Sequence, residues 1–243
     1  MKAKYLLLPC ILVSLCSCTR RSNSYRNSCV TQAISHTTST SDHTENNRND
    51  RSDLSKKMTA SEIFDRYNSA VFMVFTSDGW NDFQGSGFFI NQYGLAVSNY
   101  HVFEGTGIGL ETVKLSNGSK YKVREVIAKS KEYDYIVFKV DIPTSCNYIP
   151  VSNRCNKVGK KVFAIGSPRG LENTFSSGEI SQLRGSHFIQ INAPIDHGSS
   201  GGALINEYGE AIGITTAGLD DSGANLNFAL DIAVLKPILG TAW

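Results

Sequence analysis

The pentapeptide Gly198–Gly202, which reads Gly-Ser-Ser-Gly-Gly, is the part of the 243-residue chain most specific for chemistry. Small residues on both sides of Ser200 allow the backbone to turn sharply and to bring two amide groups toward one point. A nucleophilic serine needs such amides, because the oxyanion formed during acyl transfer must be stabilised by hydrogen-bond donors. Ser200 is therefore a candidate nucleophile, although the pentapeptide alone is equally typical of a flexible Gly/Ser loop.

The order of residues along the chain excludes one class of serine hydrolase. Residues 198–202 also satisfy the Gly-x-Ser-x-Gly pattern of the nucleophile elbow in α/β-hydrolases. In those enzymes the catalytic histidine follows the serine, and no histidine follows position 200 in this sequence. A histidine that serves Ser200 must therefore precede it.

Five histidines precede Ser200, namely His36, His43, His101, His187 and His197. The first two fall in a polar N-terminal segment. His197 is only three residues from Ser200, too close in sequence to approach its side chain across a cleft. His187 is expected to be an exposed residue in or near a strand. His101 remains, at the end of the apolar strand segment 95–102, where it could equally be a partly buried structural histidine.

A serine–histidine pair also requires a carboxylate that fixes the imidazole tautomer and stabilises the imidazolium. Asp134 is a candidate because it opens the alternating apolar run 134–140, where an acid is either an orienting carboxylate or a turn residue. Asp141, at the other end of this run, is better explained as a turn former.

Short apolar runs separated by Gly, Asn and Asp indicate an all-β fold. A capping box at residues 59–62 predicts one short helix before them. No apolar helical stripe of ten or more residues separates the runs, which argues against a parallel α/β sheet. The runs expected as strands are 71–75, 87–90, 95–98, 112–115, 120–126, 135–140, 161–165, 188–191, 203–206, 211–215 and 227–230.

The N-terminus has the composition of an export signal. Lys2 and Lys4 precede an apolar run over residues 5–15, which is too short to span about 30 Å of hydrocarbon. Residues 15–18, Leu-Cys-Ser-Cys, resemble a bacterial lipobox. Residues 1–18 are therefore expected to be a lipoprotein signal peptide with Cys18 as the lipid anchor, and an ordinary cleaved signal is the alternative.

Residues 19–57 form a polar segment in which 19 of 39 residues are Ser, Thr or Asn. Such a segment buries too little apolar surface to offset its ordering entropy, so we expect a disordered tether. The folded domain is then expected over residues 58–243, which hold 15 basic and 18 acidic residues. This slightly negative balance argues against nucleic acid as a partner.

The sequence contains no zinc-finger spacing and no His-Glu-x-x-His motif, so neither a metal nor a cofactor is expected. Cys146 and Cys155 lie nine residues apart. In an exported protein they could form a disulfide or remain two free thiols, and the sequence favours neither.

Several blocks of the sequence resemble the HtrA/Deg family of serine proteases. Three of them would carry a catalytic triad: residues 98–102 (Ser-Asn-Tyr-His-Val), 134–139 (Asp-Tyr-Ile-Val-Phe-Lys) and 198–204 (Gly-Ser-Ser-Gly-Gly-Ala-Leu). Further family blocks follow the family order at residues 85–90, 164–171, 177–181 and 209–214. The resemblance covers about residues 63–232.

This resemblance implies a chymotrypsin-type fold, in which two six-stranded antiparallel β-barrels hold the active site in the cleft between them. The first barrel would occupy residues 58–150 and the second residues 151–243. The implied triad is His101, Asp134 and Ser200, and its order along the chain agrees with that fold.

By the same resemblance, the amides of Gly198 and Ser200 would hold the oxyanion, and Ile195 would line the specificity pocket. A pocket with Ile195 and no acid at its base predicts small or medium apolar P1 residues. The substrate backbone would pair, as an added strand, with Thr216, Ala217 and Gly218.

The sequence also departs from the family. His197 stands where proline is usual, which could loosen the oxyanion loop or couple it to pH. Family members commonly carry C-terminal PDZ domains, which we do not expect in a chain that ends at Trp243. The family suggests a homotrimer, to which Phe64 and Tyr67 could contribute unless they are core residues.

The sequence thus predicts a membrane-anchored serine endopeptidase of the bacterial cell envelope that cleaves unfolded or misfolded proteins through an acyl-enzyme. Its partners would be polypeptide substrates and, through the lipid on Cys18, a membrane facing the periplasm or the cell surface. Two other functions stay open: a catalytically idle chaperone-like or binding module on the same fold, and an esterase that uses the same nucleophile.

Overall fold

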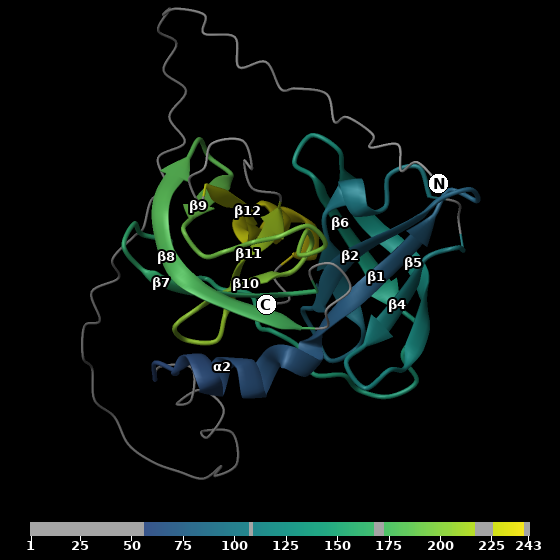
Figure 1. Ribbon diagram of the computed structural model, residues 1–243, viewed down its shortest axis with the longest axis horizontal. Coiled ribbons are helices and arrows are strands. Elements are labelled where there is room, and N and C mark those ends of the chain that lie inside the picture. Colours follow the sequence, from purple (N-terminus) through teal and green to yellow (C-terminus); the bar gives the residue numbers. More distant parts are fainter. Residues whose placement is uncertain (1–55, 107–108, 168–172, 217–225, 241–243) are drawn as a thin grey trace, which may run out of the picture. The chain divides into compact units, whose positions relative to one another are not determined.

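The computed structural model describes residues 56–106, 109–167, 173–216 and 226–240. Within these ranges twelve strands form two closed antiparallel barrels (Figure 1). The strand order is β1-β2-β3-β6-β5-β4 in the first barrel and β10-β11-β12-β9-β8-β7 in the second. The all-β double barrel expected from the sequence is confirmed. The predicted signal peptide, Cys18 and nearly all of the predicted tether lie outside the described residues.

Each barrel uses six consecutive strands of the chain. The first contains β1 (Val71–Ser77), β2 (Asp82–Phe89), β3 (Leu95–Ser98), β4 (Thr112–Leu115), β5 (Lys120–Ser130) and β6 (Tyr135–Val140). The second contains β7 (Lys161–Gly166), β8 (Thr174–Arg184), β9 (Phe188–Ile191), β10 (Ala203–Asn206), β11 (Ala211–Thr216) and β12 (Asn227–Asp231). The short helices are α2 (Ala60–Tyr67), η1 (Asn68–Ala70), η2 (Tyr100–Val102), η5 (Ile232–Leu235) and α3 (Lys236–Leu239).

Strand β8 is the one strand that the sequence pattern missed. Its residues are mostly exposed, with Ile180 the buried exception, so the apolar alternation that marks a half-buried strand is absent. Gly178 lies in its middle, where a Cβ atom would stand 2.4 Å from Asn192 Oδ1 and 2.5 Å from the Ala193 nitrogen. The close approach of β8 to the residues that follow β9 therefore explains why a glycine, which weakens a strand, stands at this position.

The predicted capping box begins helix α2. Thr59 Oγ1 accepts from the Glu62 N–H over 3.3 Å, and the Glu62 carboxylate accepts from the Thr59 N–H over 2.7 Å. Tyr67 is buried in the core, whereas Phe64 packs edge-on against Phe175 with 5.7 Å between ring centroids. Tyr67 is thus a core residue rather than a surface for another subunit. No helix within the described ranges is long and apolar enough to cross a membrane.

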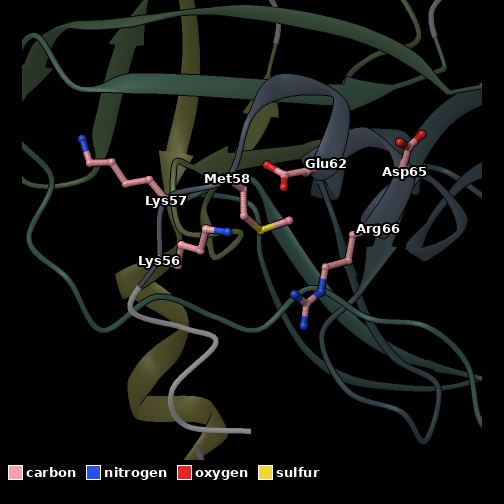
Figure 2. Close-up of a pocket in the computed structure, with 6 residues that line it drawn as sticks. All are labelled: Lys56, Lys57, Met58, Glu62, Asp65 and Arg66. Atoms are coloured by element: carbon pink, nitrogen blue, oxygen red, sulfur yellow. The ribbon is translucent and has the colours of Figure 1, made fainter. Parts of the chain in front are cut away.

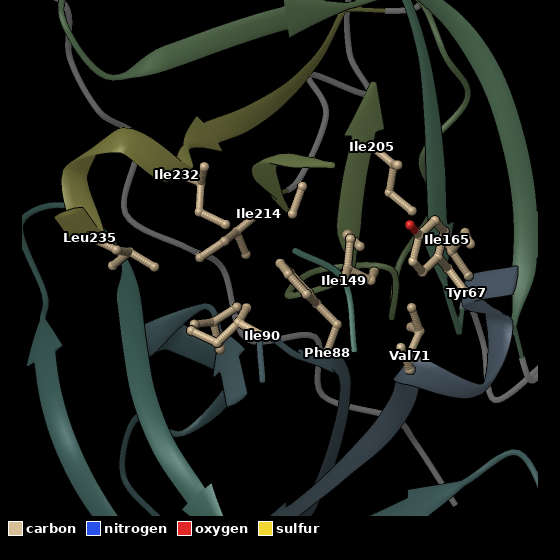
Figure 3. Close-up of a cluster of buried hydrophobic side chains, with 14 of the residues drawn as sticks. Tyr67, Val71, Phe88, Ile90, Ile149, Ile165, Ile205, Ile214, Ile232 and Leu235 are labelled. Atoms are coloured by element: carbon tan, nitrogen blue, oxygen red, sulfur yellow. The ribbon is translucent and has the colours of Figure 1, made fainter. Parts of the chain in front are cut away.

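The largest buried cluster joins the two barrels (Figure 3). Phe88 and Ile90 enter it from the first barrel, and Ile165 and Ile214 enter it from the second. Ile149, from the connection between the barrels, is fully buried among them, and its N–H donates to the Phe89 carbonyl over 2.9 Å. This shared core fixes one barrel against the other.

Cys146 and Cys155 do not form a disulfide with each other. Cys146 carries a free, half-buried thiol, so it forms no disulfide with Cys155. Its Sγ lies 3.5 Å from the Asn91 carbonyl oxygen, and burial raises the pKa of the thiol.

Candidate active site

His101 and Asp134 meet on the first barrel. The His101 Nδ1 atom lies 2.8 Å from Asp134 Oδ2, and the His101 backbone N–H donates to Asp134 Oδ1 over 2.9 Å. An ionised carboxylate only accepts hydrogen bonds, so in a neutral imidazole this contact requires the proton on Nδ1 and leaves the lone pair on Nε2. The imidazole side chain is 43% exposed. This geometry leaves Nε2 free to act as a base.

The strand that was expected to carry His101 is shorter than predicted. Strand β3 ends at Ser98, whose register partner is Ile136 of β6, and His101 lies in the 3-10 helix η2. The hydroxyl of buried Thr76 donates to the Val102 carbonyl over 2.8 Å, which fixes this turn to β1. The histidine is therefore presented by a turn beyond the sheet, where its ring can reach out from the barrel.

Asp134 has an unusual backbone conformation that aims its carboxylate at His101. Its φ is +54°, in the left-handed region that aspartate tolerates better than most residues. The side-chain amide of Asn99 donates to the Asp134 carbonyl over 2.9 Å. Asn99 is fully buried, and its Oδ1 has no hydrogen-bond partner among the described residues. Asn99 thus holds the bend from inside the barrel.

Ser200 lies in the loop that precedes β10. A turn over residues 196–199 is closed by the Ser199 N–H, which donates to the Asp196 carbonyl over 3.0 Å. Gly198, the third residue of this turn, has a φ of +92°, as a type II turn requires. The glycine at this position is therefore needed for the conformation of the loop.

The amides of this loop have the pattern that an oxyanion hole needs. The Ser199 carbonyl accepts from the Gly202 N–H over 2.9 Å and from Thr215 Oγ1 over 2.7 Å. Because a trans peptide directs its N–H opposite to its carbonyl, the Ser200 N–H points away from these partners. Within the described part of the chain, neither the Gly198 N–H nor the Ser200 N–H donates a hydrogen bond. Both are available to an anionic oxygen.

Strand β2 brings the two halves of the site together. A Cβ atom on Gly85 would lie 2.7 Å from the Val102 side chain, next to His101, and 3.3 Å from the Ser200 carbonyl oxygen. The Ser86 N–H donates to that same carbonyl over 2.8 Å. Between described residues, Ser200 Oγ and the His101 ring form no hydrogen bond. Bonds of this kind often tighten only when a substrate is bound.

Two of the residues expected to contact substrate, Ile195 and Thr216, lie on the second barrel. Ile195 is half-buried and packs against the core cluster of this barrel. Its segment is held by Ser176 Oγ, which donates to the Pro194 carbonyl over 2.8 Å, and by the Asn227 amide, which donates to the Ala193 carbonyl over 2.8 Å. The predicted contacts Thr216, Ala217 and Gly218 divide, since Thr216 ends β11 and the other two lie outside the described residues.

His187 and the pocket beside α2 lie apart from the contacts described above. His187 lies in the β8–β9 turn, with Nε2 2.7 Å from Ser186 Oγ and its ring centroid 4.6 Å from that of Tyr133. A separate pocket beside α2 is drawn in Figure 2 and is lined by Lys56, Lys57, Met58, Glu62, Asp65 and Arg66. Among the described residues, no group of three or more His, Cys, Asp or Glu side chains is arranged to hold a metal.

Three residues that position the site were not singled out from the sequence. Asn99, Thr76 and Ser86 act through hydrogen bonds that join positions 26 to 112 residues apart. Asn99 and Ser86 fall inside blocks that carry the family resemblance, but spacing alone gives no sign of a bond over such a separation.

Comparisons with known proteins place this geometry in a family context. Residues 85–214 match the trypsin-like peptidase domain. The chain is 39% identical over 164 residues to a probable serine protease do-like protein of Buchnera aphidicola, covering 63% of this chain and 34% of that protein. It is 35% identical over 158 residues to the periplasmic serine endoprotease DegP of Salmonella typhimurium, covering 61% of this chain and 33% of that protein. The chain thus spans about a third of the length of these relatives.

A solved structure supports the same relationship. The crystal structure of the serine endoprotease from Yersinia pestis matches with a TM-score of 0.66 and 29% identity. The match covers 73% of this chain and 64% of that chain.

The packing beside Ser200 can be tested with two glycines of nearly equal φ. Gly201 has a φ of +89°, and a Cβ atom there would lie 2.1 Å from the Ser86 carbonyl oxygen, whereas Gly79 has a φ of +90° and open space around it. In chemical denaturation, Gly79→Ala should lower the free energy of unfolding by about 1–2 kcal/mol through the backbone alone. Gly201→Ala should lower it by a further ~1–3 kcal/mol or prevent folding. Equal losses would contradict the close approach of Gly201 to Ser86.

Proposed function

Because the chain belongs to the trypsin-like peptidase family and is of the HtrA/Deg type, we propose that it is a serine endopeptidase acting through His101, Asp134 and Ser200. The observation that carries this proposal is the double contact of His101 with Asp134, beside a loop whose Gly198 and Ser200 amides are free. A histidine with only a structural role would not need an aspartate in the left-handed conformation to orient it. Nor would it need a nearby serine loop in which two backbone N–H groups remain available.

The reaction begins when Ser200 Oγ attacks the scissile carbonyl carbon and His101 Nε2 takes its proton. The new C–O bond gives a tetrahedral intermediate, whose negative oxygen accepts from the N–H groups of Gly198 and Ser200. The intermediate collapses, the C–N bond breaks, and the leaving amine receives the proton from His101. Water then repeats these steps on the acyl-enzyme and releases the free acid.

Asp134 acts on this reaction through His101. Its carboxylate holds the Nδ1 proton in place, so the neutral ring offers Nε2 to the serine. When the ring becomes charged, the same carboxylate stabilises the imidazolium at 2.8 Å. The second contact, from the His101 backbone N–H to Oδ1, prevents the carboxylate from rotating away.

The substrates are proposed to be unfolded or misfolded polypeptides of the cell envelope. An extended substrate would add a strand beside Thr216, which ends β11 with a half-exposed side chain, and beside Ala217 and Gly218. Relatives that carry the word periplasmic in their names support an envelope location, and Cys18 is proposed as a lipid anchor there. A trimeric assembly is proposed from the family alone.

Labelling with a fluorophosphonate tests the nucleophile. The full chain should gain the mass of one adduct, and Ser200→Ala should gain none, because only an activated serine beside an oxyanion hole reacts. Ser186→Ala is the matched control, since Ser186 is exposed and bonds the His187 ring at 2.7 Å, and it should label like wild type.

Three outcomes would contradict the proposed endopeptidase. An adduct that persists in Ser200→Ala would place the nucleophile elsewhere. A folded wild-type chain with no adduct would favour the idle binding module, and activity on esters without any on proteins would favour the esterase.

The role of Asp134 predicts a loss far larger than a structural defect would give. Asp134→Asn should reduce kcat by about 10⁴-fold, because an amide can stabilise the wrong tautomer of the imidazole. Asp141→Asn, which changes an exposed aspartate beyond the other end of β6, should leave kcat unchanged. Turnover of an internally quenched peptide measures both variants. A loss below about tenfold in Asp134→Asn would remove Asp134 from the mechanism.

The pocket assignment predicts cleavage after small or medium apolar residues. Ile195 presents an aliphatic side chain, and no acid is proposed at the base of the pocket to attract Lys or Arg. Profiling with a peptide library should show Ala, Val, Ile or Leu at P1, and Ile195→Ala should shift the preference to larger apolar residues. Val158→Ala, at a 55% exposed residue in the connection before β7, is the control. Dominant cleavage after Lys or Arg would refute this assignment.

A further inference from the structure

Ser86 is a fully buried serine of β2 whose hydroxyl joins both barrels. Its Oγ donates to the Gly198 carbonyl over 2.7 Å and accepts from the Ser167 N–H over 2.8 Å. Ser167 follows the last residue of β7, and Gly198 belongs to the loop that carries Ser200. The hydroxyl of Ser86 therefore makes two hydrogen bonds from the first barrel to the second. It donates its one proton to the loop that carries Ser200, and it accepts the N–H of the residue after β7 on a lone pair.

The backbone of Ser86 adds two more contacts at the same place. Its N–H donates to the Ser200 carbonyl over 2.8 Å, and its own carbonyl accepts from Ser98 Oγ over 2.7 Å. Ser98 ends β3, the strand that leads to His101. Ser86 thus contacts the nucleophile loop on both sides of Ser199 and also the element that precedes the base.

The peptide group that Ser86 holds lies between the two oxyanion donors. The Gly198–Ser199 peptide is fixed at its oxygen by Ser86 and at its N–H by the Asp196 carbonyl, 3.0 Å away. The free N–H of Gly198 stands before this peptide and the free N–H of Ser200 stands after it. Two donors can converge on one oxygen only if the peptide between them keeps its plane.

We propose that Ser86 is a positioning residue, whose hydroxyl holds the oxyanion loop in the conformation that leaves the Gly198 and Ser200 amides free. This proposal rests on the endopeptidase function proposed above. Ser86 touches no reacting atom and acts through the Gly198 carbonyl. Without the hydroxyl, that carbonyl and the Ser167 N–H lose a partner in a buried setting, and the loop turns to find others.

Three full-length proteins test this role: wild type, Ser86→Ala and Ser152→Ala. Ser152 is a matched control because it is also buried, and its Oγ donates to Glu210 over 2.9 Å and accepts from the Arg154 N–H over 3.1 Å. It precedes β7 and contacts neither the loop nor β2 in these bonds. Ser152 Oγ also accepts a longer bond from Asn206 Nδ2 over 3.4 Å, so Ser152→Ala loses a buried hydroxyl with at least as many bonds as Ser86→Ala, and thermal unfolding should register a decrease in both.

The activity measurements separate positioning from stability. For an internally quenched apolar peptide, Ser86→Ala should lower kcat by about tenfold, the equivalent of one hydrogen bond, with KM unchanged. The rate of fluorophosphonate labelling at Ser200 should fall by the same factor. This loss is smaller than the roughly 10²–10³-fold cost of deleting an oxyanion donor, because the donors remain in the chain. Ser152→Ala should keep the wild-type kcat and labelling rate.

Each other outcome overturns the proposal in a recognisable way. A folded Ser86→Ala with wild-type kcat, or with a raised KM only, shows that the hydroxyl does not position the donors. An equal loss of kcat in Ser152→Ala assigns the effect to stability. Absence of labelling in wild type refutes the endopeptidase function, and this inference with it.

A second variant covers the case in which Ser86→Ala does not fold. Ser86→Cys keeps a group of similar size whose S–H is a weak donor. It should lower kcat in the same direction by a smaller factor, again with KM unchanged. Wild-type kcat in Ser86→Cys overturns the proposal.

Discussion

Two closed barrels have no unpaired strand edge, so only side chains and loops can join them. In this protein one joint is the apolar cluster that includes Phe88 from β2 and Ile214 from β11. The other joint is polar and lies at the site itself, where β2 bonds the Ser200 loop and the residue after β7. The contacts that keep the barrels together are therefore partly the contacts that shape the site. The proposed nucleophile Ser200 and the proposed base His101 come from different barrels, so their relative position depends on these contacts between the barrels.

The contacts between the barrels require backbone approaches that only small residues permit. A Cβ atom on Gly85 would lie 2.7 Å from the Val102 side chain and 3.3 Å from the Ser200 carbonyl oxygen, which leaves little room for a methyl group. Gly201 approaches the Ser86 carbonyl even more closely, at a positive φ. Beside these glycines, the hydroxyl of Ser86 makes two hydrogen bonds across the same contact. The glycine-rich character that first marked residues 198–202 as unusual thus has a packing cause as well as a chemical one.

The sequence predicted the local and repeated features well, because they follow from short-range patterns. These patterns predict the capping box at Thr59 and eleven of the strands, whereas the double barrel was implied by the resemblance to the HtrA/Deg family. Strand β8 could not be predicted, because its polar, exposed residues and its Gly178 carry no period-two signal. His101 was assigned to a strand, yet β3 ends at Ser98 and η2 presents the ring. The role of Ser86 depends on a partner 112 residues away, which neither spacing nor propensity can reveal.

Two energetically unfavourable features lie in the half of the site that contains His101 and Asp134. A left-handed aspartate and a buried amide oxygen without a hydrogen-bond partner each cost roughly 1–3 kcal/mol, and within the described ranges Asp134 and Asn99 have these features. They persist because β3 and β6 pair as far as Ser98 and Ile136. This pairing fixes the chain just before Asn99 and just after Asp134. Asp134 directly precedes β6, and its left-handed backbone turns its carboxylate toward both N–H groups of His101. The Asn99 amide holds this bend. The pairing of β3 with β6 keeps the two segments on either side of it in place, so the unfavourable conformations are maintained.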